Sequence, residues 1–223
     1  MKISNETLQI LKNFTTINPS YVFREGNIVS SISVGNNIFA RATVVEDFPQ
    51  EVCIYDLNSL LSLLTLQEDQ DVEFGENSII VSKDNGQFEY FYSDASNIRP
   101  EVSKWPQKTP PAEGFYTFTL TAAEIQTINK AATVVGATKF GVSCEDGKVQ
   151  INVNDPKTPG SNSYRKFLDD FDGDNFNAFI PFENFKVVND SYDVTISKKR
   201  FFHFKNNNRD LAYWFALDID AKV

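Results

Sequence analysis

Histidine, cysteine and methionine are scarce in this chain of 223 residues, which contains one His, two Cys and one Met. A Ser–His–Asp triad or a histidine-based zinc site needs histidines that the sequence hardly supplies. His203 lies in the alternating run 201–205 and is expected to be a strand residue. Cys53 and Cys144 lie in apolar runs, where buried free thiols in a reducing compartment are expected.

Phosphate-binding motifs and membrane signals are missing as well. The sequence has no glycine-rich phosphate loop, Walker motif or dinucleotide fingerprint. Residues 1–6 lack the apolar core of a signal peptide, and no run approaches the length of a membrane span. We therefore expect a soluble intracellular protein that has no membrane partner and binds no cofactor.

One acidic cluster, residues 168–174, resembles a calcium loop. The required Gly and the distal Glu are not at the right offsets, so an acidic solvated turn and no metal site are expected. A hydrolase built on paired carboxylates has this cluster as its main support. We predict that the protein is not an enzyme.

Positive charge is in short supply, since the net charge is −9 and the sequence pI is about 4.7. Phosphate binding depends on Lys and Arg, so this balance argues against a nucleic-acid partner. The deficit is uneven. Residues 1–110 hold 8 Lys and Arg against 15 Asp and Glu, whereas residues 111–223 hold 13 against 15. A local basic surface therefore remains compatible with the acidic average.

Apolar side chains recur at helical spacing in four segments. The first covers 4–17, with Ser4 or Asn5 as the N-cap and Pro19 ending the helix. The second covers 56–66, the third follows a Thr121 cap, and a short fourth covers 181–188. Alternating or apolar runs predict strands at 21–25, 27–34, 38–45, 51–55, 71–74, 78–82, 87–92, 116–120, 139–144, 148–153, 163–168, 176–180, 192–197, 201–205 and 211–217.

The order of these elements repeats along the chain. Residues 99–114 are rich in proline and fit neither a helix nor a central strand, so we predict an extended connector there. It separates a domain over 1–98 from a second over 115–223. Both halves combine two helices with several antiparallel strands, which predicts an α+β class with two similar domains.

Three lysines lie beside core positions of the predicted helices: Lys12 on the first, Lys130 on the third and Lys186 on the fourth. Each helix would then have an apolar side for the sheet and a side that carries lysine. A simple solvated face explains this pattern as readily as a binding surface does.

Several short segments resemble one known family. They are Met1-Lys2-Ile3-Ser4, Leu11-Lys12-Asn13-Phe14, Thr16-Ile17-Asn18, Ile54-Tyr55-Asp56-Leu57-Asn58, Gly173-Asp174-Asn175 and Phe185-Lys186. The family is the sliding clamp, or DNA polymerase processivity factor, of T-even-type bacteriophages. The resemblance implies a subunit with two similar clamp domains, each with two helices packed on antiparallel sheets. It further implies a homotrimeric ring whose helices line a hole around duplex DNA.

The resemblance also gives roles to individual residues. Lys12, Lys130 and Lys186 would face the DNA phosphates without sequence preference, although Thr133 stands where a second basic residue is expected. Trp105 and Pro106 on the connector would bind a C-terminal peptide of the replicative polymerase. The alternative is that Trp105 only packs the connector down.

Ring closure would join strand 87–92 to strand 163–168 of the next subunit, with Glu89 facing Arg165 or Lys166. A clamp loader and the cytoplasm of an infected bacterial host are implied as partner and location. The alternative reading of the whole chain is a β-rich oligomeric interaction or adaptor protein with no role in nucleic-acid metabolism.

Overall fold

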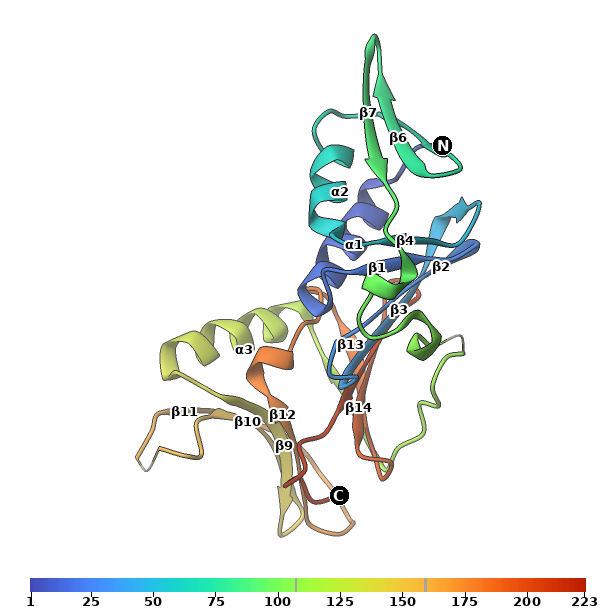
Figure 1. Ribbon diagram of the computed structural model, residues 1–223. Coiled ribbons are helices and arrows are strands. Elements are labelled where there is room, and N and C mark those ends of the chain that lie inside the picture. The colour runs from blue at the N-terminus through green and yellow to red at the C-terminus, as the bar shows by residue number, and fades with distance from the viewer. Residues whose placement is uncertain (107, 159) are drawn as a thin grey trace. The chain divides into compact units, whose positions relative to one another are not determined.

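The computed structural model describes residues 1–106, 108–158 and 160–223. The chain divides into two compact units, Met1–Thr109 and Pro110–Val223. This division falls within the predicted connector, of which Gln107 lies outside the described residues. Each unit combines helix with antiparallel sheet (Figure 1), which confirms the predicted α+β class.

Unit 1 contains two helices and seven strands among its described residues. The elements in chain order are α1 (Asn5–Ile17), β1 (Tyr21–Phe23), β2 (Gly26–Ile32), β3 (Ile38–Phe48), β4 (Val52–Ile54), α2 (Leu57–Leu64), β5 (Asp71–Phe74), β6 (Ser78–Lys83) and β7 (Gly86–Phe91). Antiparallel pairing joins β1 to β4, β2 to β3, and β5, β6 and β7 in that order. Strand β3 reaches Phe48, three residues beyond its predicted end.

Helix α1 begins where the sequence predicts. Ser4 is the N-cap and its hydroxyl accepts a hydrogen bond from the amide of Thr7. The side chains of Ile10, Leu11 and Phe14 are almost fully buried. They are spaced three or four residues apart along one face, so that face packs against α2, β2 and β3.

Helix α2 is capped by Asp56, which accepts a hydrogen bond from the amide of Asn58. It buries Leu57, Leu60, Leu61 and Leu64 and lies beside α1 (Figure 1). The predicted helix extended two residues further, to Leu66, which is exposed.

Unit 2 has one α-helix and eight strands among its described residues. These elements are β8 (Tyr116–Leu120), α3 (Ala122–Val135), β9 (Lys139–Glu145), β10 (Lys148–Asn154), β11 (Ser163–Asp170), β12 (Phe176–Pro181), β13 (Tyr192–Ser197), β14 (Phe201–Asn206) and β15 (Leu211–Ala216). One sheet has the order β11-β10-β9-β12, and α3 packs on its β10 and β11 strands. Strands β8, β13, β14 and β15 are joined in that order by antiparallel pairing.

Helix α3 is delimited by clear signals at both ends. Thr121 and Glu124 form a reciprocal capping box at the start, as the predicted Thr121 cap suggests. Gly136 ends the helix in the left-handed region, with φ of 64°, which glycine adopts at little cost.

The predicted fourth helix is wrong. Segment 181–188 forms a single 3-10 turn, Phe182–Asn184, and then continues without regular structure. Eight residues make a helix that is too short to be stable without strong packing, and Val187 and Val188 are β-branched. Phe185 is buried instead against Phe140, with the two rings tilted to each other and their centroids 4.6 Å apart. Unit 2 therefore has one α-helix where two were expected.

The connector is less extended than predicted. It holds the 3-10 turn Val102–Lys104, preceded by another at Ala95–Asn97. Between them the Arg99–Pro100 peptide bond is cis. The indole of Trp105 donates a hydrogen bond to the carbonyl of Pro100 at 3.0 Å, so the chain folds back on itself at this point.

Within the described ranges, no helix combines the length and the apolar character that crossing a bilayer requires.

Candidate nucleic-acid interface

Lys12 lies on the exposed side of α1. Its neighbours Leu11 and Phe14 are buried, so the lysine projects from the flank that does not face the core. The start of this helix is anchored by Glu46 of β3, whose carboxylate accepts hydrogen bonds from the Ser4 amide and, at 2.5 Å, from the Thr7 hydroxyl. Burial alone would raise the pKa of Glu46, but these hydrogen bonds together lower it.

Lys130 is exposed on α3, as predicted. Thr127, Thr133 and Val134 are exposed near it, and Val134 is 82% accessible. Among these residues the lysine carries the single charge. The outer side of α3 is therefore sparsely basic, with a threonine at 133.

Lys186 differs from the prediction because it does not lie on a helix. It is half-buried, and its main-chain N–H bonds the carbonyl of Asn184 at 2.8 Å. The segment that carries it is nevertheless held firmly. Two tyrosines hydrogen-bond the main chain of Val188. The Tyr192 hydroxyl donates to the Val188 carbonyl at 2.8 Å, and the Val188 N–H donates to the Tyr213 hydroxyl at 3.3 Å.

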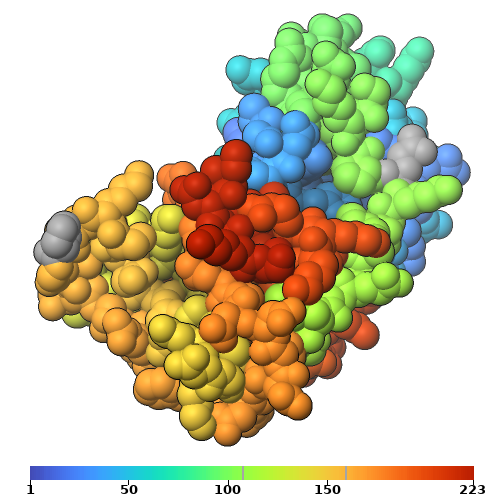
Figure 2. Space-filling model, turned by 90° about the horizontal axis from the view of Figure 1, so that it is seen from below, coloured from blue at the N-terminus to red at the C-terminus, as the bar shows by residue number. Residues whose placement is uncertain are grey.

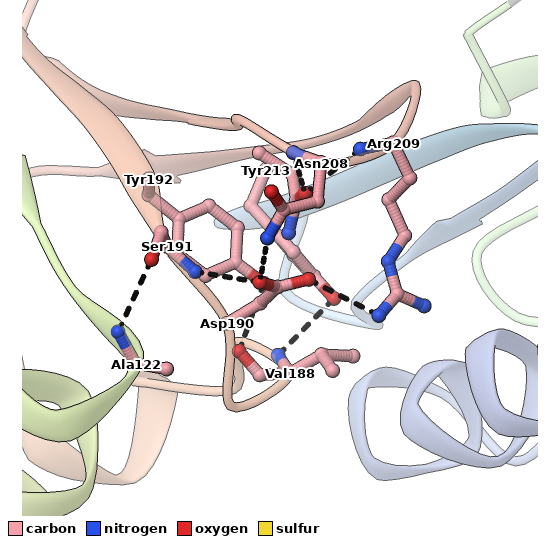
Figure 3. Close-up of polar contacts among 9 residues, drawn as sticks. Ala122, Val188, Asp190, Ser191, Tyr192, Asn208, Arg209 and Tyr213 are labelled. Atoms are coloured by element: carbon pink, nitrogen blue, oxygen red, sulfur yellow. Dashed lines mark hydrogen bonds and ion pairs between the residues drawn. The ribbon is translucent and has the colours of Figure 1, made fainter.

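Asp190 is the centre of a hydrogen-bond network that also holds this segment (Figure 3). Its carboxylate accepts hydrogen bonds from the Ser191 amide at 2.8 Å and the Asn208 amide group at 2.5 Å. It also pairs with Arg209 at 3.1 Å. Burial alone would raise the pKa of Asp190, but hydrogen bonds from these groups and Asn206 lower it.

The same network reaches α3, because the Ser191 hydroxyl accepts a hydrogen bond from the Ala122 amide at 3.3 Å (Figure 3). Segment 186–191 is thus fixed to the first turn of the helix that carries Lys130. The hydrogen bonds replace the helical scaffold that the sequence suggested. No pattern in the sequence indicated this cluster.

Trp105 is 2% exposed and lies edge-on to Tyr21, with ring centroids 5.9 Å apart. This burial favours the packing alternative for Trp105. Pro106 is half-buried and lines a hollow of about 290 Å³ in unit 1. The other residues around this hollow are Arg24, Glu25, Ile28, Ser30, Phe39, Arg41 and Lys108.

The strands predicted to join subunits both lie at sheet edges, β7 in unit 1 and β11 in unit 2. Glu89 is exposed and accepts a hydrogen bond from the Ser78 hydroxyl at 2.7 Å. Arg165 is exposed on β11. The same faces carry Phe91 and Phe167, 66% and 70% exposed, which the sequence reasoning missed. Alternation within each strand was the signal that could have found them.

The side chain of Lys166 does not lie where the sequence predicted, at the edge that would face Glu89 of the next subunit. It is the register partner of the buried Ile151, so its side chain lies on the side of the sheet that α3 covers. There it forms an ion pair with Glu124, which also closes the capping box. Burial alone would raise the pKa of Glu124, and its hydrogen bonds from Lys166 and Thr121 lower it. Lys166 is therefore engaged within its own chain, and Arg165 faces the opposite side.

His203 lies in β14, as predicted, and its ring lies 4.7 Å from that of Trp214. Burial and the nearby Lys205 lower the pKa of His203 to about 4, so the ring is neutral at pH 7. Cys144 is buried, Cys53 is half-buried, and both are free thiols.

The predicted acidic turn begins later than expected, because β11 continues through Asp170. Asp170 pairs with Lys148 at 2.8 Å on the surface. No group of three or more potential metal ligands occurs in the described part of the chain.

Comparison with known proteins finds similarity to one group of proteins. The model of the family described as "DNA polymerase processivity factor" matches residues 4–90. The sliding clamp of Vibrio phage KVP40 is 27% identical over 202 residues, covering 88% of this chain and 90% of the relative. The sliding clamp of Enterobacteria phage T4 is 26% identical over 228 residues, covering 99% and 98%.

Solved structures share the fold at much lower identity. The Proliferating Cellular Nuclear Antigen of Entamoeba histolytica superposes with a TM-score of 0.69 at 12% identity, covering 95% of this chain and 94% of the other. PCNA of Thermococcus kodakaraensis gives 0.68 at 13% identity, covering 97% and 98%. The chain is thus similar over most of its length to phage sliding clamps, and part of it matches the model of the DNA polymerase processivity factors.

Proposed function

We propose that this chain is a sliding clamp and works as one of three identical subunits in a closed ring around duplex DNA. The observation that carries the proposal is the pair of edge strands, one on each unit. Strand β7 presents Glu89 and Phe91, and β11 presents Arg165 and Phe167. Pairing β7 of one subunit with β11 of the next would satisfy both edges, bury the phenylalanines and place opposite charges together. Three subunits follow from the resemblance to the T-even-type clamps.

The sparse lysines suit a ring that slides. Many phosphate contacts would hold the protein in one place and make its binding strongly dependent on salt. In a closed ring, topology prevents escape, so weak contacts from Lys12, Lys130 and Lys186 suffice. The acidic remainder of the chain would repel DNA from the outside of the ring. The clamp itself would carry out no chemistry.

Partner proteins would reach the clamp beside the connector. We place a C-terminal peptide of the replicative polymerase in the hollow that Pro106 lines, over the exposed Ile28. Trp105 would act from beneath, by fixing the connector that forms one wall. A loader would open the ring, and the site of action would be the cytoplasm of an infected bacterium.

Retention on circular DNA tests this function. Clamp loaded on a nicked plasmid should co-elute with the DNA in high salt, because topology is insensitive to screening. Cutting the plasmid once should release it. Equal retention on cut and closed circles would contradict the ring and favour an adaptor protein with no topological link.

A further inference from the structure

A groove of about 680 Å³ lies on unit 2, in the size range of about 300–1,000 Å³ typical of ligand sites. Its floor is the face of strands β9, β10 and β12 opposite α3, because the alternate residues Val149, Ile151 and Val153 of β10 are buried on the helix side. Asp220 and Lys222 of the C-terminal segment form one wall. Figure 2 shows this segment in dark red against the orange atoms of the unit.

Amide side chains dominate the floor. Gln150 and Asn154 lie on β10 and Asn177 on β12, and within the described residues their side chains make no hydrogen bond. Ser143 of β9 is the register partner of both Gln150 and Asn177, so these three form a row across three strands. Each amide offers both donors and an acceptor, which is the complement of a peptide group.

The charges around the groove cancel. Lys139 and Lys222 are balanced by Glu145 and Asp220. The ammonium of Lys139 lies 3.6 Å from the centre of the Phe179 ring, and that ring is only 8% exposed. A nucleobase or sugar therefore finds no free aromatic face here, and a phosphate chain finds no net positive charge. A neutral ligand rich in amides fits best.

The spacing points to an extended chain. Alternate residues of a strand recur about every 6.8 Å, and an extended peptide has the same repeat. Gln150 and Asn154 are four residues apart on one strand, so an extended peptide of about five residues lying along β10 would reach both side chains. We propose that this groove docks an uncharged, extended peptide segment of a partner protein through its main chain, as a second partner site apart from the hollow of unit 1.

Hydrogen bonds hold one wall of the groove in place, and the groove would stay open in the proposed ring. Arg200 fixes the wall by donating hydrogen bonds to the carbonyls of Asp218, Ile219 and Ala221, at 2.7, 3.0 and 2.9 Å. Asn177 and Lys222 exchange two main-chain hydrogen bonds at 2.8 and 2.9 Å. No residue of β11 is among the described residues that line the groove, so pairing through that edge leaves it accessible.

A phage-displayed library of random peptides, selected on the full-length protein, tests the proposal. Selected peptides should bind at least about tenfold more weakly to Gln150→Trp, which fills the floor, and equally well to Thr119→Trp on the exposed face of β8. Asn154→Ala and Asn177→Ala, which preserve the fold, should each weaken binding about threefold to tenfold. Replacing the peptide's main-chain N–H groups by N-methyl should abolish binding.

Peptides that bind Gln150→Trp and the alanine variants as well as wild type would overturn the proposal, as would recovery of no binder. Tolerance of N-methylation would exclude main-chain recognition. An oligothymidylate or a maltooligosaccharide that bound the groove in place of peptides would also contradict it. Retention on circular DNA is read separately, so a failed groove leaves the clamp function untouched.

Discussion

At the scale of single residues, the sequence predicted the positions of the helix lysines better than the position of the strand lysine. Lys12 and Lys130 follow from helical spacing, since their neighbours Leu11 and Ile128 are buried as the pattern requires. Lys166 could not be placed, because its partner Glu124 is 42 residues away in the chain. The direction of a strand side chain depends on register, and register is fixed by neighbours that a local pattern does not contain.

Glutamine at Lys12 or Lys130 should reduce the salt dependence of DNA binding without changing the oligomer mass. Each phosphate contact contributes about 0.9 to the slope of log K against log salt, so each variant should lose up to about that amount. Fluorescence anisotropy on short duplexes would measure the slope. The control is Lys148→Gln, in the surface pair with Asp170. If Lys148→Gln reduced the slope by the same amount, Lys12 and Lys130 would contribute no more to DNA binding than an ordinary surface lysine.

Glu46→Gln should destabilise the protein at neutral pH by about 1–3 kcal/mol, because it removes a buried, charge-assisted anchor of α1. The folded state lowers the pKa of Glu46, so its contribution is present above the unfolded pKa and is lost as pH falls through the folded value. Urea unfolding of wild type and variant should therefore converge at low pH. A difference that grew with acidification would contradict this assignment.

At the scale of elements, periodicity predicted most helices and strands, with ends displaced by a few residues. Segment 181–188 was the exception: its apolar residues suit a short helix, yet distant tyrosines and Asp190 satisfy its backbone in another conformation. The conformation of the connector was likewise predicted only in part. Proline content indicated an extended chain, whereas the pocket that buries Trp105 is made by residues remote in sequence, among them Tyr21.

Trp105→Ala should destabilise unit 1 by about 3–5 kcal/mol, since it removes a large buried side chain. Trp105→Phe should cost much less, because it retains most of the packing and loses the hydrogen bond to Pro100. Thermal unfolding would rank the two variants. If Trp105→Ala kept wild-type stability but lost polymerase-peptide binding, the tryptophan would be a contact residue and its packing role would be wrong.

Lys166→Met should lower the melting temperature through loss of the ion pair with Glu124, while the oligomer mass stays the same. The methionine retains much of the aliphatic stem, so packing on α3 is largely conserved. Sedimentation and calorimetry on one sample would separate the two effects. Dissociation of the oligomer at unchanged melting temperature would restore Lys166 to the subunit interface.

At the scale of the whole molecule, the proposed ring closure depends on two edges that belong to different units of the chain. Element order and resemblance led to both edges from sequence, but the exposed Phe91 and Phe167 emerged from the structure. An unpaired edge with exposed phenylalanines would invite aggregation in a monomer. In the proposed ring, pairing with a second copy would cover both strands and prevent such aggregation.

Sedimentation equilibrium of charge-swapped variants tests ring closure through β7 and β11 most directly. The wild type should have the mass of a trimer, and Arg165→Glu or Glu89→Lys alone should weaken it, because each places like charges across the β7–β11 junction. The double variant should recover the trimer. A wild type that is monomeric, or single variants and a double variant that all keep the wild-type mass, would contradict ring closure through these strands.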